Sequence, residues 1–135
     1  MKDEKINIMV DEIAKYILDN KYSNIELTSF LDQLKLEILN RVFIGNDEVL
    51  VMKRRGGIEP FDLEKLKKNI AGSSDDVKQS LSEGELNMIA KHVKSKIKGL
   101  NYRVISSKDI IGITKAALEE LDYDGVLVGY SAFNK

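Results

Sequence analysis

The stretch from Val49 to Leu66 constrains the fold more than any other part of the sequence, because it contains a complete strand–turn–strand–helix signal. It begins with three apolar residues that favour a strand, Val49-Leu50-Val51. Three cations then lead to Gly56-Gly57, a pair that readily supplies the positive φ angles of a tight hairpin turn. The chain returns through residues 58–60. Since Pro60 has no N–H for a sheet ladder, we expect this return strand to lie at a sheet edge or to end there.

The residues after the hairpin predict a helix and, with it, a phosphate site. Asp62 stands where a helix N-cap is expected. Between Val51 and Lys68, six Lys or Arg residues stand against three Asp or Glu. Arginine forks, lysine ammonium groups and the free N–H groups of a helix start all bind phosphate. Glu59 and Asp62 can accept hydrogen bonds from ribose hydroxyls or an exocyclic amine. In the alternative interpretation, the cations only keep an edge strand from pairing with neighbouring molecules.

The same stretch resembles the start of an ATP-cone domain. Val51-Met52-Lys53-Arg54-Arg55-Gly56 is similar to that family's Val-x-Lys-Arg-x-Gly hairpin, and Phe61-Asp62 with Lys65-Leu66 is similar to the pairs that follow it. The far end resembles the last two helices of the domain, in the form found in the zinc-ribbon repressor of ribonucleotide reductase genes. The matching segments there are Ser106–Gly112, Ala116-Ala117-Leu118, Leu121-Asp122 and Gly129–Phe133. The resemblance covers residues 48–135, which we take as one domain.

The resemblance implies an allosteric sensor, used mainly in ribonucleotide reductases, that binds ATP or dATP, with or without Mg²⁺, between a small sheet and a helix bundle. Val51, Lys53 and Arg54 would line the base and phosphates, and Glu59, Asp62 and Lys65 would form the floor. The whole implied nucleotide-binding set is Val51, Lys53, Arg54, Gly56, Glu59, Asp62, Lys65, Ser107 and Lys135. The sequence departs from the family at Ile110-Ile111-Gly112, where some relatives place a histidine beside the nucleotide.

Residues 1–45 predict an N-terminal helical hairpin. Ile6, Met9, Val10, Ile13 and Ile17 recur at helical spacing, and Ser23 with Glu26 forms a capping-box pattern before a second apolar helix that ends near Val42. We find no functional motif in this segment and interpret it as a packing or dimerisation arm.

The remaining pattern predicts an α+β, mostly α, fold: a four-helix bundle covered by a small three-stranded sheet, preceded by the N-terminal hairpin. We expect the first bundle helix over 62–70, broken at Ala71–Asp76. A second helix would start after Ser82 and end at Gly99. Residues 100–105 read as the third strand, and Ser106 or Ser107 as the cap of the third helix. Asp122 or Asp124 would cap the last helix, with Val126, Leu127, Tyr130 and Phe133 facing inward.

Composition argues against catalysis and for a regulatory or binding role. There is no cysteine, His92 is the only histidine, and no Walker-type phosphate loop occurs, so we expect no enzyme and no zinc ribbon. Residues 1–48 carry a net charge of −4 and residues 49–135 a net charge of +3, from six basic and ten acidic against fifteen basic and twelve acidic residues. The acidic N-terminal part makes nucleic acid an unlikely partner.

Because residues 1–5 are followed by an amphipathic run and no long apolar run occurs, we expect a cytoplasmic protein with no membrane partner. Two functions remain open. In the first, the protein senses an adenine nucleotide and acts through a homo-oligomer or a regulated partner. In the second, it is an interaction or scaffold domain that keeps the cone fold without nucleotide.

Overall fold

The computed structural model describes residues 4–76 and 80–134, and the chain divides into two compact units, Met1–Ile38 and Leu39–Lys135. Six helices and a three-stranded sheet are found in these described ranges, so the α+β, mostly α, class is confirmed. The elements are α1 (Glu4–Asn20), α2 (Asn24–Val42), β1 (Leu50–Met52), β2 (Ile58–Pro60), α3 (Leu63–Asp76), α4 (Glu83–Gly99), β3 (Val104–Ser106), α5 (Ser107–Glu120) and α6 (Asp124–Phe133). None of the helices described is long and apolar enough to cross a membrane.

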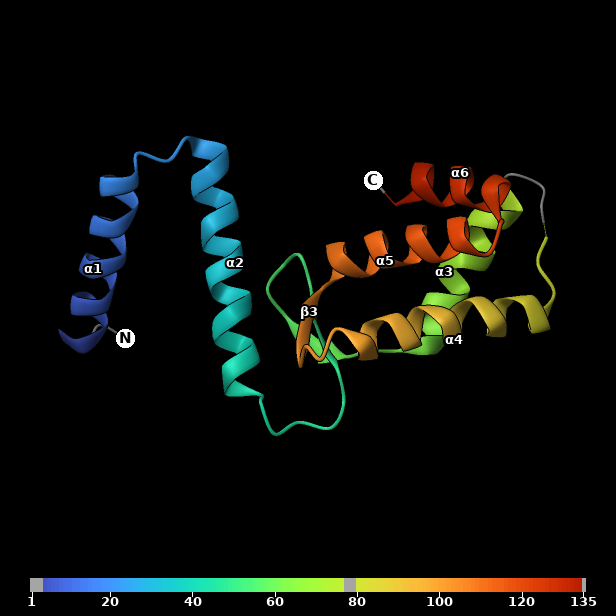
Figure 1. Ribbon diagram of the computed structural model, residues 1–135, viewed down its shortest axis with the longest axis horizontal. Coiled ribbons are helices and arrows are strands. Elements are labelled where there is room, and N and C mark those ends of the chain that lie inside the picture. Colours follow the sequence, from blue (N-terminus) through green and yellow to red (C-terminus); the bar gives the residue numbers. More distant parts are fainter. Residues whose placement is uncertain (1–3, 77–79, 135) are drawn as a thin grey trace. The chain divides into compact units, whose positions relative to one another are not determined.

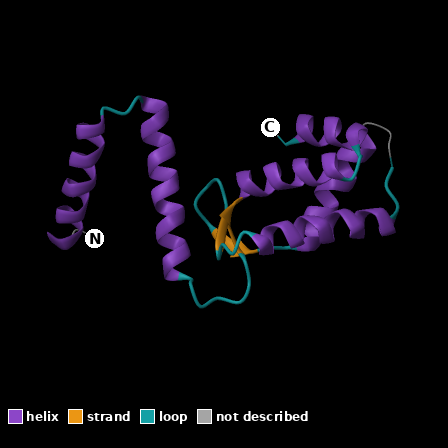
Figure 2. Cartoon of the chain, viewed as in Figure 1, coloured by secondary structure: helices purple, strands orange, loops and turns teal. Residues whose placement is uncertain are grey.

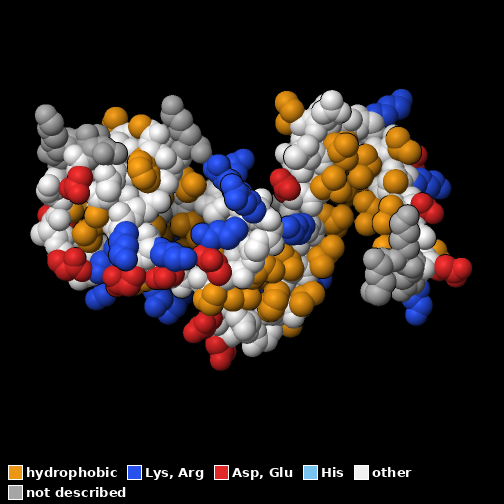
Figure 3. Space-filling model, turned by 180° about the vertical axis from the view of Figure 1, so that it is seen from behind, with side chains coloured by type: hydrophobic (Ala, Val, Ile, Leu, Met, Phe, Trp, Pro, Cys, Tyr) orange, Lys and Arg blue, Asp and Glu red, His pale blue; other side chains and the backbone are white. Residues whose placement is uncertain are grey.

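The N-terminal unit consists of α1 and the greater part of α2, joined by a short turn. The predicted capping box is confirmed: the Glu26 N–H donates to Ser23 Oγ, and the Ser23 N–H donates to Glu26 Oε1. Near the turn the rings of Tyr16, Tyr22 and Phe30 contact one another, with Tyr16 and Phe30 stacked at 5.4 Å between centroids. Neither helix contains a buried residue. Hydrophobic side chains are therefore visible over both helices (Figure 3).

In the C-terminal unit, a small sheet lies at one end of four helices (Figures 1 and 2). The strand order is β2-β1-β3, with β1 antiparallel to β2 and parallel to β3. β2 is an edge strand that ends at Pro60, as the proline predicted. At the hairpin turn, the Lys53 N–H donates to Gly57 O at 2.7 Å and Gly56 adopts a φ of 93°. A glycine is required there, because side chains strongly disfavour that conformation.

The helices of the C-terminal unit form a bundle in which α3 packs against α4 and α6, and α5 packs against α4 and α6. The apolar faces of all four helices meet in one core with Ile105 of β3. Its most deeply buried side chains include Ile70 of α3, Ile89 and Val93 of α4, Leu118 of α5 and Tyr130 of α6. The core therefore contains residues from α3, α4, β3, α5 and α6, and the sheet lies at one end of the helix bundle.

The predicted end of α3 is wrong, because the helix continues to Asp76 through Gly72. Ser73 and Ser74 are fully buried, and their hydroxyls donate to the backbone oxygens of Asn69 and Ala71. These local bonds satisfy the hydroxyls inside the bundle. Small side chains at this point allow close packing, and burial overrides the turn-like composition of the segment.

The predicted end of α4 is confirmed, whereas the predicted N-cap of α6 is wrong. Gly99 is the last residue of α4, and the left-handed position after the helix is taken by Asn101, with φ 58°. Neither predicted aspartate caps α6: its N-cap is Tyr123, which makes no capping bond through its side chain. Asp122 instead adopts a left-handed φ of 64° between α5 and α6. In α6, Phe133 points outward and is 57% exposed, while Val126 and Tyr130 are buried as predicted.

The last turn of α2 belongs to the C-terminal unit and is fastened to the open edge of β3. Asn40 Oδ1 accepts from the N–H groups of Arg103 (2.7 Å) and Val104 (3.0 Å), and Asn40 Nδ2 donates to Val104 O (2.8 Å). The amide side chain thus pairs with the edge of β3 much as another strand would.

Candidate functional site

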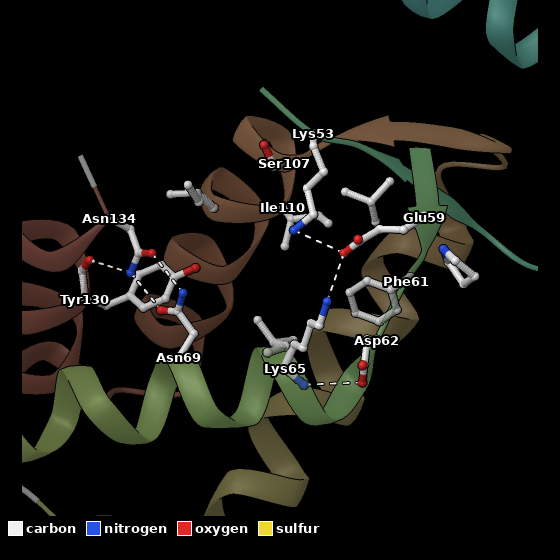
Figure 4. A pocket seen from close by; sticks show the side chains of 14 residues that line it. Lys53, Glu59, Phe61, Asp62, Lys65, Asn69, Ser107, Ile110, Tyr130 and Asn134 are labelled. Atoms are coloured by element: carbon white, nitrogen blue, oxygen red, sulfur yellow. Dashed lines mark hydrogen bonds and ion pairs between the residues drawn. The ribbon is translucent and has the colours of Figure 1, made fainter. Parts of the chain in front are cut away.

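A cavity of about 170 Å³ lies where the hairpin meets the helix bundle (Figure 4). β1 and the hairpin contribute Val51 and Lys53, and β2 contributes Glu59. α3 and the residues just before it supply one wall, and the start of α5 and the end of α6 supply the others. These walls contain Phe61, Asp62, Lys65, Leu66 and Asn69 on one side, and Ser107, Ile110, Ile111, Tyr130 and Asn134 on the other.

Two ammonium groups from different elements meet at one carboxylate in this cavity. The antiparallel register places Val51 opposite Glu59, so Lys53, at the end of β1, lies beside Glu59 across the hairpin. Lys53 Nζ is 3.1 Å and Lys65 Nζ is 3.2 Å from the same oxygen, Glu59 Oε1. Their hydrogen bonds, that of Lys53 first, hold the pKa of Glu59 below its ordinary value. The glutamate is therefore an anion at neutral pH.

Asp62 has the capping role expected from the sequence. Its Oδ1 accepts from the N–H groups of Glu64 (3.0 Å) and Lys65 (3.3 Å) at the start of α3. This cap fixes the first turn of α3, and with it the position from which Lys65 reaches Glu59. The aspartate lines the cavity, but its carboxylate is already bonded to the helix.

An amide pair that was not predicted from the sequence joins the two walls of the cavity. Asn69 Nδ2 donates to Asn134 Oδ1 at 3.1 Å, and Asn134 Nδ2 donates to Asn69 Oδ1 at 2.9 Å and to Tyr130 O at 3.0 Å. Asn69 lies one helical turn after Lys65, a spacing that places both on one face of α3. That spacing is the sequence signal that could have found Asn69; Asn134 has no comparable local signal.

The structure brings most of the predicted site residues together. Val51, Lys53, Glu59, Asp62, Lys65 and Ser107 all line the cavity. Arg54 and Gly56 lie in the hairpin turn and are not among its lining residues. Lys135 lies outside the described residues. The binding roles of these residues remain predictions.

A second cavity, of about 600 Å³, is larger and shares Pro60 and Phe61 with the first. Its other lining residues come from the segment before β1, the first residue of α3, the end of α4 and the loop before β3. Its cations, Lys94, Lys98 and Arg103, are set against two acidic residues of the 47–48 segment. Size alone would favour this cavity. We place the candidate site in the smaller one, because there the motif residues converge.

His92 forms a structural contact between helices outside this cavity. Its Nε2 is 2.8 Å from Glu120 Oε2, and Lys96 Nζ is 2.6 Å from Glu120 Oε1, so the pair links α4 to α5. The hydrogen bond from Lys96, followed by that of His92, lowers the pKa of Glu120. These contacts account for the histidine as a structural residue.

A family model described as ATP cone domain matches residues 49–135, which is more than half of the chain. The chain belongs to the ATP-cone family. Among similar curated proteins are the transcriptional repressor NrdR of Streptococcus pneumoniae strains Hungary19A-6, JJA and Taiwan19F-14. Each is 32% identical over 74 residues, covering 55% of this chain and 46% of the repressor. The chain therefore spans about half the length of the curated relatives that it matches. We refer to residues 49–135 as the cone.

Proposed function

We propose that this protein is a regulatory module that binds ATP or dATP, with or without Mg²⁺, in the cavity between the sheet and the bundle of the cone. The observation that carries the proposal is the convergence of the Lys53 and Lys65 ammonium groups within 3.2 Å of a single point. Two positive charges from separate elements at one point form a site suited to the oxygens of a phosphate chain. Membership of the ATP-cone family supports an adenine nucleotide as the ligand.

The lining of the cavity suggests which residues would bind each part of the nucleotide. Lys53 and Lys65, with Arg54 from the adjacent turn, would take the phosphates. The apolar wall formed by Ile110 and Ile111 at the start of α5 would take the base. At about 170 Å³ the cavity is smaller than the roughly 300–1,000 Å³ of typical ligand pockets, so binding would require it to open.

We further propose two domains, an N-terminal arm of residues 1–45 and a nucleotide-binding domain of residues 48–135 that contains the cone. In this proposal, nucleotide binding changes the assembly of the protein through the arm. Large apolar side chains are exposed along the arm, including Met9 (55%), Leu18 (75%) and Ile25 (81%). Two helices without a buried residue cannot form a core by themselves, and a second copy of the arm would complete a four-helix arrangement. A regulated partner protein is the other candidate for this surface. The proposed role is not catalytic and does not involve nucleic acid.

The alternative function is an interaction or scaffold domain that has kept the cone fold without its ligand. The same exposed arm favours it, because the arm needs a partner whether or not nucleotide binds. The two functions differ in what the hairpin cations do, and this difference can be measured.

Calorimetric titration of the protein with ATP and dATP, with and without magnesium, tests the proposal. Binding should weaken at least about tenfold in Lys53→Ala/Arg54→Ala, because two phosphate contacts are lost. Lys68→Ala/Lys91→Ala is the matched control: it removes two exposed cations that do not line the cavity and should bind like the parent protein. Sedimentation of the parent with each nucleotide then tests assembly. If the titration shows no binding heat and millimolar nucleotide causes no thermal shift, the sensor proposal fails and the scaffold function replaces it.

A further inference from the structure

The centre of the proposed phosphate site is held by the protein's own carboxylate. Figure 4 shows the side chains of Lys53, from the hairpin, and Lys65, from α3, both directed toward Glu59. Both ammonium groups contact the same oxygen, Oε1, at 3.1 and 3.2 Å. One anionic oxygen shared between two ammonium groups is the arrangement that a phosphate oxygen would be expected to make with these lysines.

The charges of the cavity cancel while Glu59 stays in this position. The charged side chains of its lining are Lys53 and Lys65, against Glu59 and Asp62. Asp62 is bound to the N–H groups at the start of α3. Glu59 has no comparable backbone bond among the contacts described, and its side chain is 37% exposed, so it has room to move toward solvent. Of the two acids, Glu59 is the one that a ligand can displace.

We propose that Glu59 is an internal competitor for the phosphate site: it binds Lys53 and Lys65 in the ligand-free protein and gives them up when phosphate enters. This inference rests on the proposed function, since it concerns the same cavity. It adds a regulatory role for one residue. Each phosphate chain must replace an anion already in place, so the apparent affinity is lower than the two lysines alone would give.

The competitor also ties two elements together. Glu59 lies on β2, Lys53 follows β1, and Lys65 lies in the first turn of α3, so the shared carboxylate fastens the hairpin to the helix. Its release would remove the ion pairs that join the hairpin to α3. One phosphate oxygen can make both ammonium contacts, as Glu59 Oε1 does, but a chain of phosphates brings more negative charge to the two lysines than a single phosphate does. The device therefore favours nucleoside triphosphates and diphosphates over monophosphates.

The test uses inorganic triphosphate, a probe with neither ribose nor base, titrated calorimetrically into the full chain. Glu59→Gln keeps the size of the side chain and removes its charge. We expect it to bind triphosphate at least roughly threefold more tightly than the parent, the scale of one partly exposed ion pair. Glu64→Gln is the matched control, because Glu64 is a neighbouring acid that pairs with Lys67 and does not line the cavity. It should change the affinity less than about twofold, which separates a local effect from a change of net charge.

The outcomes distinguish this inference from the proposed function. Equal or weaker binding of triphosphate by a folded Glu59→Gln variant overturns the competitor role, even if the parent binds ATP. Tighter triphosphate binding with weaker ATP binding supports it, and shows in addition that Glu59 contacts the nucleoside after release. If the parent binds no nucleotide but Glu59→Gln binds triphosphate, the competitor is real and the proposed sensor is not. If neither protein binds either ligand, both proposals fail.

Discussion

The contact between Asn40 and β3 allows a quantitative prediction about the stability of the cone. Asn40→Ala removes three hydrogen bonds of 2.7 to 3.0 Å to the backbone of Arg103 and Val104. Each such bond contributes about 1 kcal/mol net to the free energy of unfolding. Because the site is only partly buried, water can replace some of these hydrogen bonds. We therefore expect the free energy of unfolding to fall by about 2–3 kcal/mol. For a unit of this size, that corresponds to a lower Tm by at least about 8 °C.

The assay is urea denaturation together with amide hydrogen exchange. Asn40→Ala should move the urea midpoint with an unchanged slope, since the surface exposed on unfolding stays the same. The N–H groups of Arg103 and Val104 should lose protection first, because they are the two donors to the side chain. Asn40→Asp should fall in between: it keeps both acceptor bonds and loses the donor to Val104 O.

The control is Asn46→Ala, the same substitution in the following loop. Asn46 donates one exposed bond, to Glu48 O at 2.6 Å, so its loss should lower the free energy of unfolding by less than about 1 kcal/mol. If Asn40→Ala falls within about 0.5 kcal/mol of the parent, or if protection at Arg103 and Val104 is unchanged, then the amide does not hold the edge of β3 and the reasoning is refuted.

The other predictions concern glycines and a buried tyrosine. Gly72→Ala should raise the free energy of unfolding by about 0.5–1 kcal/mol, because a Cβ at this position of α3 meets nothing within 4 Å; Gly56→Ala should lower it by about 1–2 kcal/mol, because φ there is 93°. Urea midpoints of both variants check this contrast in sign. Burial raises the pKa of Tyr130, so its neutral form stabilises the fold below the ordinary tyrosine pKa of about 10, and this stability is lost as pH rises through the raised value. The hydrogen bond with Tyr16 raises the pKa of Tyr22, and burial raises the pKa of Tyr123 as well. Absorbance titration at alkaline pH should therefore show several late-ionising tyrosines, and Tyr130→Phe should remove one of them.

Features that depend on a few neighbouring residues could be predicted from the sequence. Capping boxes at Ser23 and Ser82 need only two side chains three residues apart, and both are present. Pro60 ends an edge strand because a missing N–H excludes it from the middle of a sheet whatever the rest of the chain does. The domain boundary between residues 45 and 48 stays a prediction. The compact units of the structure divide earlier, so that the last turn of α2 belongs to the C-terminal unit.

Features decided by packing could not be predicted in this way. The sequence Gly72-Ser73-Ser74 predicts a break in α3, yet the helix continues and both serines are fully buried inside the bundle. The sequence predicts an aspartate as the N-cap of α6, but the N-cap is Tyr123, whose hydroxyl donates to Glu85 Oε2 at 3.1 Å. That contact joins residues 38 positions apart, so no local sequence pattern predicts it. The partner of Tyr123 is distant in sequence, and the burial of Ser73 and Ser74 depends on the packing of the whole helix bundle.

The candidate site shows the same division between local and distant contributions. The motif residues that line it from one side lie within a single hairpin and the first turn of the next helix, so one short pattern identified them. The other side combines α5 and α6, and the Asn69–Asn134 pair that joins it to α3 spans 65 positions. Ile110 and Ile111, which stand where the resemblance to the family leads us to expect a histidine, both line the cavity. The departure replaces a group that can carry charge with an apolar wall, which leaves Lys53, Lys65 and the adjacent Arg54 as the cations proposed for the phosphates. Any phosphate binding by this cone should therefore depend more steeply on these three residues than on anything contributed by α5.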